Sequence, residues 1–166
     1  EIPNENMSLE DQIKDLAWQK AKALVDSGKL MKSQEKLVLA ADTVVVLEQK
    51  IMGKPKDLDE SRSHICRLSG RTHRVVTAIC MWDLGTQKFE TAAEWADVTF
   101  RNLTEAEIEE YVVSRDGMDK AGAYGIQGPG RALVESLDGN FDNVMGLPIN
   151  LVERLLKKNG WIVDRR

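Results

Sequence analysis

The sequence predicts an α/β fold with a mixed β-sheet, on three observations. Helical and strand patterns are interspersed along the chain without a strict strand–helix–strand repeat, which makes a doubly wound sheet the weaker alternative. A chain of 166 residues is too short for an eight-fold α/β barrel. No linker or low-complexity tract divides the sequence, so we expect a single domain over residues 1–166.

The first predicted element is a helix from about Ser8 to Ser27. Ser8 is followed three residues later by Asp11, a spacing that caps helix starts, and Gly28 supplies a left-handed stop. Apolar residues recur at helical spacing and form one stripe: Leu9, Ile13, Leu16, Ala17, Ala21, Leu24 and Val25.

The run Leu37–Leu47 is β-branched and almost wholly apolar, which predicts a strand buried on both faces. A turn after it leads to Ile51–Met52 and predicts a hairpin. Two long strands are expected further on, over Thr72–Trp82 and Phe89–Phe100.

Capping signals predict the remaining helices. Asp57 opens a helix that reaches Leu68, and the capping box of Thr104 and Glu107 opens another that ends near Ser114. A glycine-dense segment follows over residues 115–130. After it we expect short strands around Ala132–Leu137 and Asn143–Met145, and a last helix over Pro148–Lys158.

Composition narrows the class of protein. The net charge of −4 argues against a nucleic-acid surface, which needs a basic patch. No apolar stretch approaches the ~20 residues of a membrane span, and no signal peptide is visible, so we expect a cytoplasmic protein without a membrane partner. Cys66 and Cys80 form neither a disulfide framework nor a zinc spacing and are predicted to be reduced core residues.

Asp42 is the most informative residue, because it interrupts an apolar strand. Burial of an isolated carboxylate is costly, so Asp42 needs a cation, a metal or several hydrogen-bond donors. Open α/β enzymes commonly place their sites where a strand emerges from the core. The structural alternative is an aspartate that ends the strand and caps a turn.

Lysines beside rigid or glycine-rich backbone form the second signal. Lys54 lies between Gly53 and Pro55 and could meet a phosphate as a point charge, although a solvated turn explains it equally well. For Lys56 the solvated turn is favoured. The segment 118–128 has no Walker A order, but its backbone N–H groups and Lys120 could bind an anion; its alternative role is a connector.

Covalent catalysis and a histidine metal site have little support. His64 and His73 have no metal-ligand spacing and are predicted to be structural or solvent-facing. Neither cysteine has a histidine–acid arrangement nearby in the sequence. The residues alone therefore indicate a phosphate-handling α/β enzyme that works by electrostatic and metal-assisted chemistry.

Six segments in order resemble the Maf family, and together they cover essentially the whole chain. The segment DKAGAYGIQG is highly specific, and the others become specific through their order and spacing. The segments are LAWQKA (16–21), AADTVV (40–45), GKPKD (53–57), LSGRTH (68–73), DKAGAYGIQG (119–128) and NVMGLP (143–148).

The resemblance implies an elongated mixed sheet flanked by helices, with the active site in a central cleft, as in the inosine-triphosphate pyrophosphatases. It also implies Mg²⁺- or Mn²⁺-dependent hydrolysis between the α and β phosphates of a nucleoside triphosphate. The resemblance assigns Asp42 as the catalytic carboxylate. It assigns Glu1, by its spacing to Lys20, as a second acid that binds the same metal. Lys54 becomes a phosphate contact, and Lys20 and Lys120 are expected to line the same cleft.

The resemblance further assigns base choice to Thr43 and Gln127, in the pattern of the dTTP/UTP branch. The Gln127 amide offers one donor and one acceptor, which matches the edge of uracil or thymine. Maf proteins begin with a strand and a Ser-rich Pro-Arg-Arg loop that would precede Glu1. We therefore expect the natural protein to be longer by roughly thirty residues.

A rival function of another class is a nucleotide-binding regulator of cell division, of the septum-formation inhibitor type, without turnover. A degenerate nucleotide-binding scaffold is a third alternative. A pure binder needs cations but no buried acid, so Asp42 together with Lys54 and Lys120 favours the enzyme. The expected partner is the nucleotide substrate, and a homodimer is left open.

Overall fold

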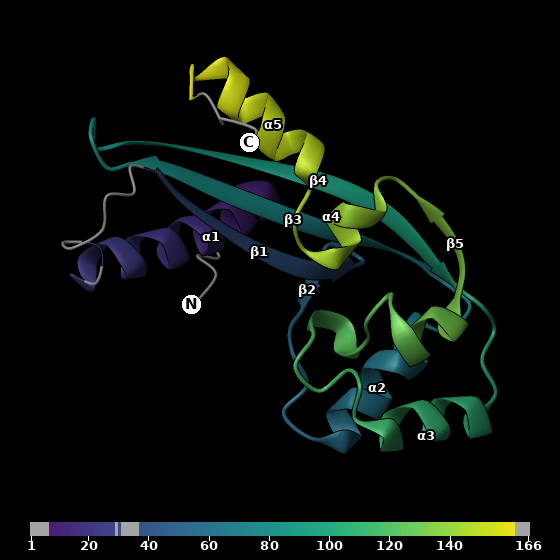
Figure 1. Ribbon diagram of the computed structural model, residues 1–166. Coiled ribbons are helices and arrows are strands. Elements are labelled where there is room, and N and C mark those ends of the chain that lie inside the picture. The colour runs from purple at the N-terminus through teal and green to yellow at the C-terminus, as the bar shows by residue number, and fades with distance from the viewer. Residues whose placement is uncertain (1–6, 29, 31–36, 162–166) are drawn as a thin grey trace. The chain divides into compact units, whose positions relative to one another are not determined.

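The computed structural model describes residues 7–28, 30 and 37–161 (Figure 1). Helices flank a five-stranded sheet of order β2-β1-β3-β4-β5, so the predicted α/β class is confirmed. The elements are α1 (Leu9–Asp26), β1 (Leu37–Leu47), β2 (Lys50–Met52), α2 (Leu58–Leu68), β3 (Thr72–Asp83), β4 (Lys88–Phe100), α3 (Glu105–Ser114), η2 (Ala121–Ala123), η3 (Gly128–Leu133), β5 (Val134–Asp138), α4 (Phe141–Met145) and α5 (Ile149–Lys158).

The chain divides into two compact units. Unit 1 takes the described residues of 1–42, 77–94 and 146–166, and unit 2 takes residues 43–76 and 95–145. β1, β3 and β4 contribute residues to both units. The expected catalytic carboxylate, Asp42, is the last residue of its segment in unit 1.

In unit 1, α1 begins where its capping residue predicts. The backbone N–H of Asp11 donates to Ser8 Oγ at 3.2 Å, and Gly28 follows the helix with a φ of +69°. The apolar stripe is largely buried, through Ile13, Leu16, Ala17 and Ala21.

In unit 1, strand β3 is covered on both faces. Every residue from Thr77 to Met81 in β3 is buried, which requires layers on both sides. Leu151 and Leu155 of α5 pack against Ile79 and Met81 of β3, and Figure 1 shows α1 and α5 on opposite sides of this strand.

Unit 2 has a continuous apolar core in which α2 packs against α3 (Figure 1). Asp57 caps α2 by accepting from the Glu60 backbone N–H at 2.8 Å. Arg62 of α2 donates twice to Glu109 of α3, at 2.9 and 3.0 Å. β1 and β2 form the predicted antiparallel hairpin, with Val46 opposite Ile51.

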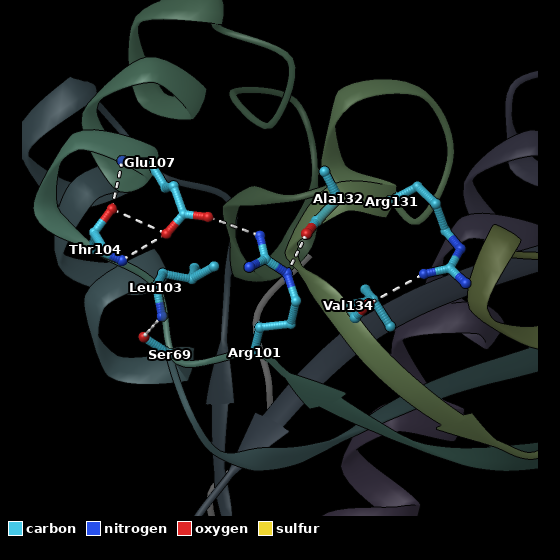
Figure 2. Close-up of polar contacts among 8 residues, drawn as sticks. All are labelled: Ser69, Arg101, Leu103, Thr104, Glu107, Arg131, Ala132 and Val134. Carbon is cyan, nitrogen blue, oxygen red and sulfur yellow. Dashed lines mark hydrogen bonds and ion pairs between the residues drawn. The ribbon is translucent and has the colours of Figure 1, made fainter.

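The start of α3 is fixed by its capping box, shown in Figure 2. Glu107 Oε2 accepts from the Thr104 backbone N–H at 2.8 Å, and the Glu107 backbone N–H donates to Thr104 Oγ1 at 3.3 Å. The Thr104 N–H is the main cause that lowers the pKa of Glu107 to about 2. Arg101 links Glu107 to the Ala132 carbonyl, so it ties α3 to the 3-10 turn η3 before β5.

Two predicted elements differ from the structure. Asn143–Met145 was expected as a strand but belongs to helix α4, where the buried Asn143 side chain donates to the Val75 carbonyl at 3.2 Å. An apolar run this short has no period that separates strand from helix. The strand expected around Ala132–Leu137 begins only at Val134, after the 3-10 turn η3.

Two burial predictions are also wrong. β1 is buried throughout only from Val44 to Leu47, whereas Leu39 is 40% exposed, because an apolar run alone does not show that a strand is covered along its whole length. Cys80 is buried, and burial raises the pKa of its thiol to about 11. Cys66 is exposed, since it lies off the buried stripe of α2.

Candidate functional site

Asp42 on β1 has the cationic partner that its position demands. Its side chain is only 15% exposed, and its Oδ1 forms an ion pair with Lys20 Nζ of α1 within unit 1. The same ammonium donates to the Ala41 carbonyl at 3.2 Å. Because the carboxylate is mostly desolvated, this pair holds one oxygen in a defined direction.

The sequence of α1 explains how Lys20 reaches the strand. Ala17 and Ala21 flank it on the buried stripe and are fully buried. Small side chains there allow the helix to lie close to the strand, so the long Lys20 side chain can place its ammonium group at Asp42.

A second group of expected site residues lies in unit 2. The Gly122 N–H donates to the Gly53 carbonyl at 3.1 Å, which holds the turn that carries Lys54 against the glycine-rich segment. Lys54 is exposed there. Lys120 Nζ donates to the Asp116 carbonyl at 2.5 Å and to Asp119 Oδ1 at 2.7 Å.

Asp119 connects the two lysines electrostatically. Its pKa is lowered chiefly by the hydrogen bond and charge of Lys120, and the charge of Lys54 lowers it further. The Asp119 side chain is 82% exposed, so its ion pair with Lys120 is weak and easily exchanged for another anion.

Two glycines that flank residues 118–128, Gly117 and Gly130, are required for close packing of the backbone. A Cβ at Gly117 would lie 1.8 Å from the Ala123 carbonyl oxygen, and one at Gly130 would lie 2.0 Å from that of Gly125. The N–H groups of Gly122 and Gly125 already donate to protein oxygens. The expectation that the segment offers free N–H groups to an anion is therefore wrong at Gly122 and Gly125.

Gln127 and Thr43, the residues expected to choose the base, also lie in unit 2. Gln127 is exposed, and its Nε2 donates to Met145 Sδ at 3.3 Å. A thioether is a weak acceptor, so a ligand oxygen would replace it at little cost. Thr43 is half-buried and follows Asp42 directly on β1.

Both histidines were expected to be structural or solvent-facing, and both are buried. His73 is buried, its Nε2 lies 2.7 Å from Tyr124 Oη, and its ring meets Phe100 edge-on at 5.1 Å. Burial lowers the pKa of His73 to about 4 and also lowers that of His64.

Tyr111 is a polar contact that the sequence did not indicate. It lies on the buried face of α3, where its spacing is typical of core residues. Its hydroxyl nevertheless donates to Asp116 Oδ2 at 2.8 Å and accepts from the Gly125 N–H at 3.3 Å.

The donor set fits a divalent metal that is held largely by the substrate. Within the described part of the chain, no three His, Cys, Asp or Glu side chains gather as a metal site. Of the two acids expected to bind the metal, Asp42 and Glu1, only Asp42 can be described, because Glu1 lies outside the described residues. Mg²⁺ is commonly bound by one or two carboxylates together with substrate phosphates and water, and Asp42 suits that role.

These features define an α/β protein with a lysine-paired carboxylate on one strand and further lysines on a turn and a glycine-rich loop. Residues 1–159 match the family described as "Maf-like protein". The chain therefore belongs to the Maf family.

Curated relatives agree over most of the chain. It is 44% identical over 158 residues to the "dTTP/UTP pyrophosphatase" of Bdellovibrio bacteriovorus, covering 95% of this chain and 82% of the relative. Proteins of the same name from Syntrophomonas wolfei and Bacillus velezensis are 47% and 41% identical. These matches cover 78% and 93% of this chain, and 68% and 78% of the relatives. Among the described residues, no helix combines the length and apolarity of a membrane span.

Proposed function

We propose that this protein hydrolyses nucleoside triphosphates, with preference for dTTP and UTP, to nucleoside monophosphate and pyrophosphate. The names of its relatives support this substrate class. The observation that carries the proposal is the mostly buried Asp42 carboxylate, held by Lys20. A protein that only bound polyphosphate would need the lysines but would gain nothing from a desolvated acid.

In this mechanism the lysines hold the polyphosphate chain. Lys54 and Lys120 provide point charges for the phosphates, and Lys120 exchanges Asp119 for a phosphate oxygen. Their charge offsets the negative charge that develops on the departing pyrophosphate.

Asp42 acts at the reacting phosphorus. A water oxygen attacks the α-phosphorus, the bond to the bridging oxygen of the β-phosphate breaks, and pyrophosphate leaves with that electron pair. The water proton passes to Asp42 if the carboxylate is the general base, while Lys20 keeps the other side of the carboxylate fixed. The alternative role of Asp42 is to hold Mg²⁺ or Mn²⁺, which when bound would neutralise phosphate charge.

Gln127 and Thr43 select the base. The Gln127 amide can donate to a carbonyl oxygen of uracil or thymine and accept from the ring N–H. A site of this kind rejects a base with the wrong edge, because its own polar groups are then left without partners.

The test is turnover by Asp42→Asn, which changes the side chain almost isosterically. Phosphate release is followed with dTTP and inorganic pyrophosphatase, and Asp59→Asn is the matched control, since Asp59 is 94% exposed on α2. We expect Asp42→Asn to lose more than a hundredfold in kcat, which corresponds to roughly 3 kcal/mol of barrier, while Asp59→Asn keeps the native rate.

The outcomes separate the proposal from its rivals. A loss below tenfold in Asp42→Asn with unchanged circular dichroism removes Asp42 as the essential acid. If the native protein binds dTTP in a calorimeter but does not turn over any common nucleoside triphosphate with Mg²⁺ or Mn²⁺, it is a nucleotide-binding regulator.

A further inference from the structure

One buried hydroxyl joins two points of the loop that carries Lys120. Tyr111 is only 5% exposed and belongs to the apolar core of unit 2. Its Oη donates to Asp116 Oδ2 at 2.8 Å, before Lys120 in the sequence, and accepts from the Gly125 N–H at 3.3 Å, after it. The hydroxyl thus closes the loop from α3.

The same two points touch Lys120 directly. Lys120 Nζ donates to the Asp116 carbonyl at 2.5 Å. A Cβ placed on Gly125 would lie 3.0 Å from both Cδ and Cε of Lys120, so the lysine stem runs across the bare Cα of this glycine. A shift of either point changes where the ammonium group lies.

We propose that Tyr111 is a positioning residue for Lys120, which it holds in place for the phosphates of the substrate through Asp116 and Gly125. This inference rests on the proposed function, which makes Lys120 a phosphate contact. We call the four residues Tyr111, Asp116, Lys120 and Gly125 the tyrosine clamp.

The contacts of Lys120 differ in strength, and this difference explains how the tyrosine clamp would act when a phosphate binds. The bond between Lys120 and the exposed Asp119 is weak and is given up when a phosphate arrives. The carbonyl of Asp116 and the surface of Gly125 remain and still direct the lysine. Burial and the bond to Asp116 raise the pKa of Tyr111, so its hydroxyl stays a donor.

Tyr111→Phe removes the hydroxyl and keeps the ring in the core. We expect kcat/KM for dTTP to fall about tenfold, mainly through KM, which is the size expected for one lost positioning contact to a charged group. Val112→Ala is the control for stability, because Val112 is 1% exposed on the same helix and has no polar part in the clamp. It should lower the melting temperature and leave kcat/KM unchanged.

Gly125→Ala is an independent variant with the same target. Its φ lies outside the left-handed region, so alanine is allowed, and the nearest contacts of the added methyl group are the Lys120 Cδ and Cε. We expect a rise in KM, and no such rise when Lys120 is already alanine.

The decisive measurement is a double-mutant cycle. In the Lys120→Ala background, Tyr111→Phe should change kcat/KM less than twofold. An equal loss with and without Lys120 would show a purely structural tyrosine, and a neutral Lys120→Ala would also overturn the clamp while the native activity stands.

Failure of the proposed function has a different signature, namely no dTTP turnover in the native protein. The cycle is then run on the Kd for inorganic tripolyphosphate by calorimetry. Coupling between Tyr111 and Lys120 in that Kd supports the clamp, and additive losses refute it.

Discussion

Alanine variants of the glycines near Lys120 should differ in stability, according to the atoms that an added Cβ would contact. At Gly130 the new atom would lie 2.0 Å from the Gly125 carbonyl oxygen, which is backbone and cannot rotate away. At Gly53 it meets nothing within 4 Å, and φ lies outside the left-handed region. At Gly128 it also meets nothing, but φ is +61°.

The expected costs follow from these contacts. Gly130→Ala forces two backbone segments apart by more than ~1 Å in a packed region, which places it at or above the ~1–3 kcal/mol of ordinary overpacking. Gly128→Ala carries the left-handed penalty of roughly 1–2 kcal/mol. Gly53→Ala should be neutral or stabilise by up to about 1 kcal/mol, because it restricts only the unfolded chain.

Urea unfolding of the three variants measures their free energies of unfolding, and the comparison is valid if their m-values are equal. We expect the free energy of unfolding to fall in the order Gly53→Ala, Gly128→Ala, Gly130→Ala. If Gly130→Ala were within 1 kcal/mol of Gly53→Ala, the close approach of residues 125 and 130 would be wrong.

Three further predictions concern pH, metal and base. Burial lowers the pKa of His73 to about 4 in the folded protein, against 6.5 for the free side chain, so between these two pH values only the unfolded chain gains this proton. The free energy of unfolding should therefore fall by about 3 kcal/mol from pH 7 to pH 4 on account of His73. In His73→Phe the urea midpoint should depend less on pH over this range. Exhaustive EDTA treatment should abolish dTTP turnover and added Mg²⁺ or Mn²⁺ should restore it, whereas full activity after chelation would argue against any metal role for Asp42. Gln127→Glu removes the amide donor and should reduce the kcat/KM ratio of dTTP over GTP, so an unchanged ratio would remove Gln127 from base choice.

Local signals allowed much of the fold to be predicted from the sequence. Ser8, Asp57 and Thr104 each cap the helix that their spacing predicted. β1 has the predicted bounds, Leu37–Leu47. A helix cap and a valine-rich strand each depend on residues that are close together in the sequence, so both can be predicted from the sequence alone.

The elements that could not be predicted depend on distant partners. Asn143 lies in helix α4, and its side chain donates to the Val75 carbonyl on β3, a contact that no local pattern encodes. The need of Asp42 for a cation was evident, but only the fold shows that Lys20 from α1 forms the pair. Tyr111 sits at an ordinary core position, so its hydroxyl contacts had no signal in the sequence.

Gly122 explains in physical terms why three of the family-like segments occur together. A Cβ at Gly122 would lie 2.8 Å from Val45 Cγ2, which belongs to AADTVV, and its N–H donates to the carbonyl of Gly53, which belongs to GKPKD. DKAGAYGIQG therefore packs against both segments at a residue that admits no side chain. Thr43, Lys54 and Lys120 each lie within two residues of these contact points in the sequence. The packing at Gly122 therefore brings together the three segments that carry the residues expected to meet the substrate.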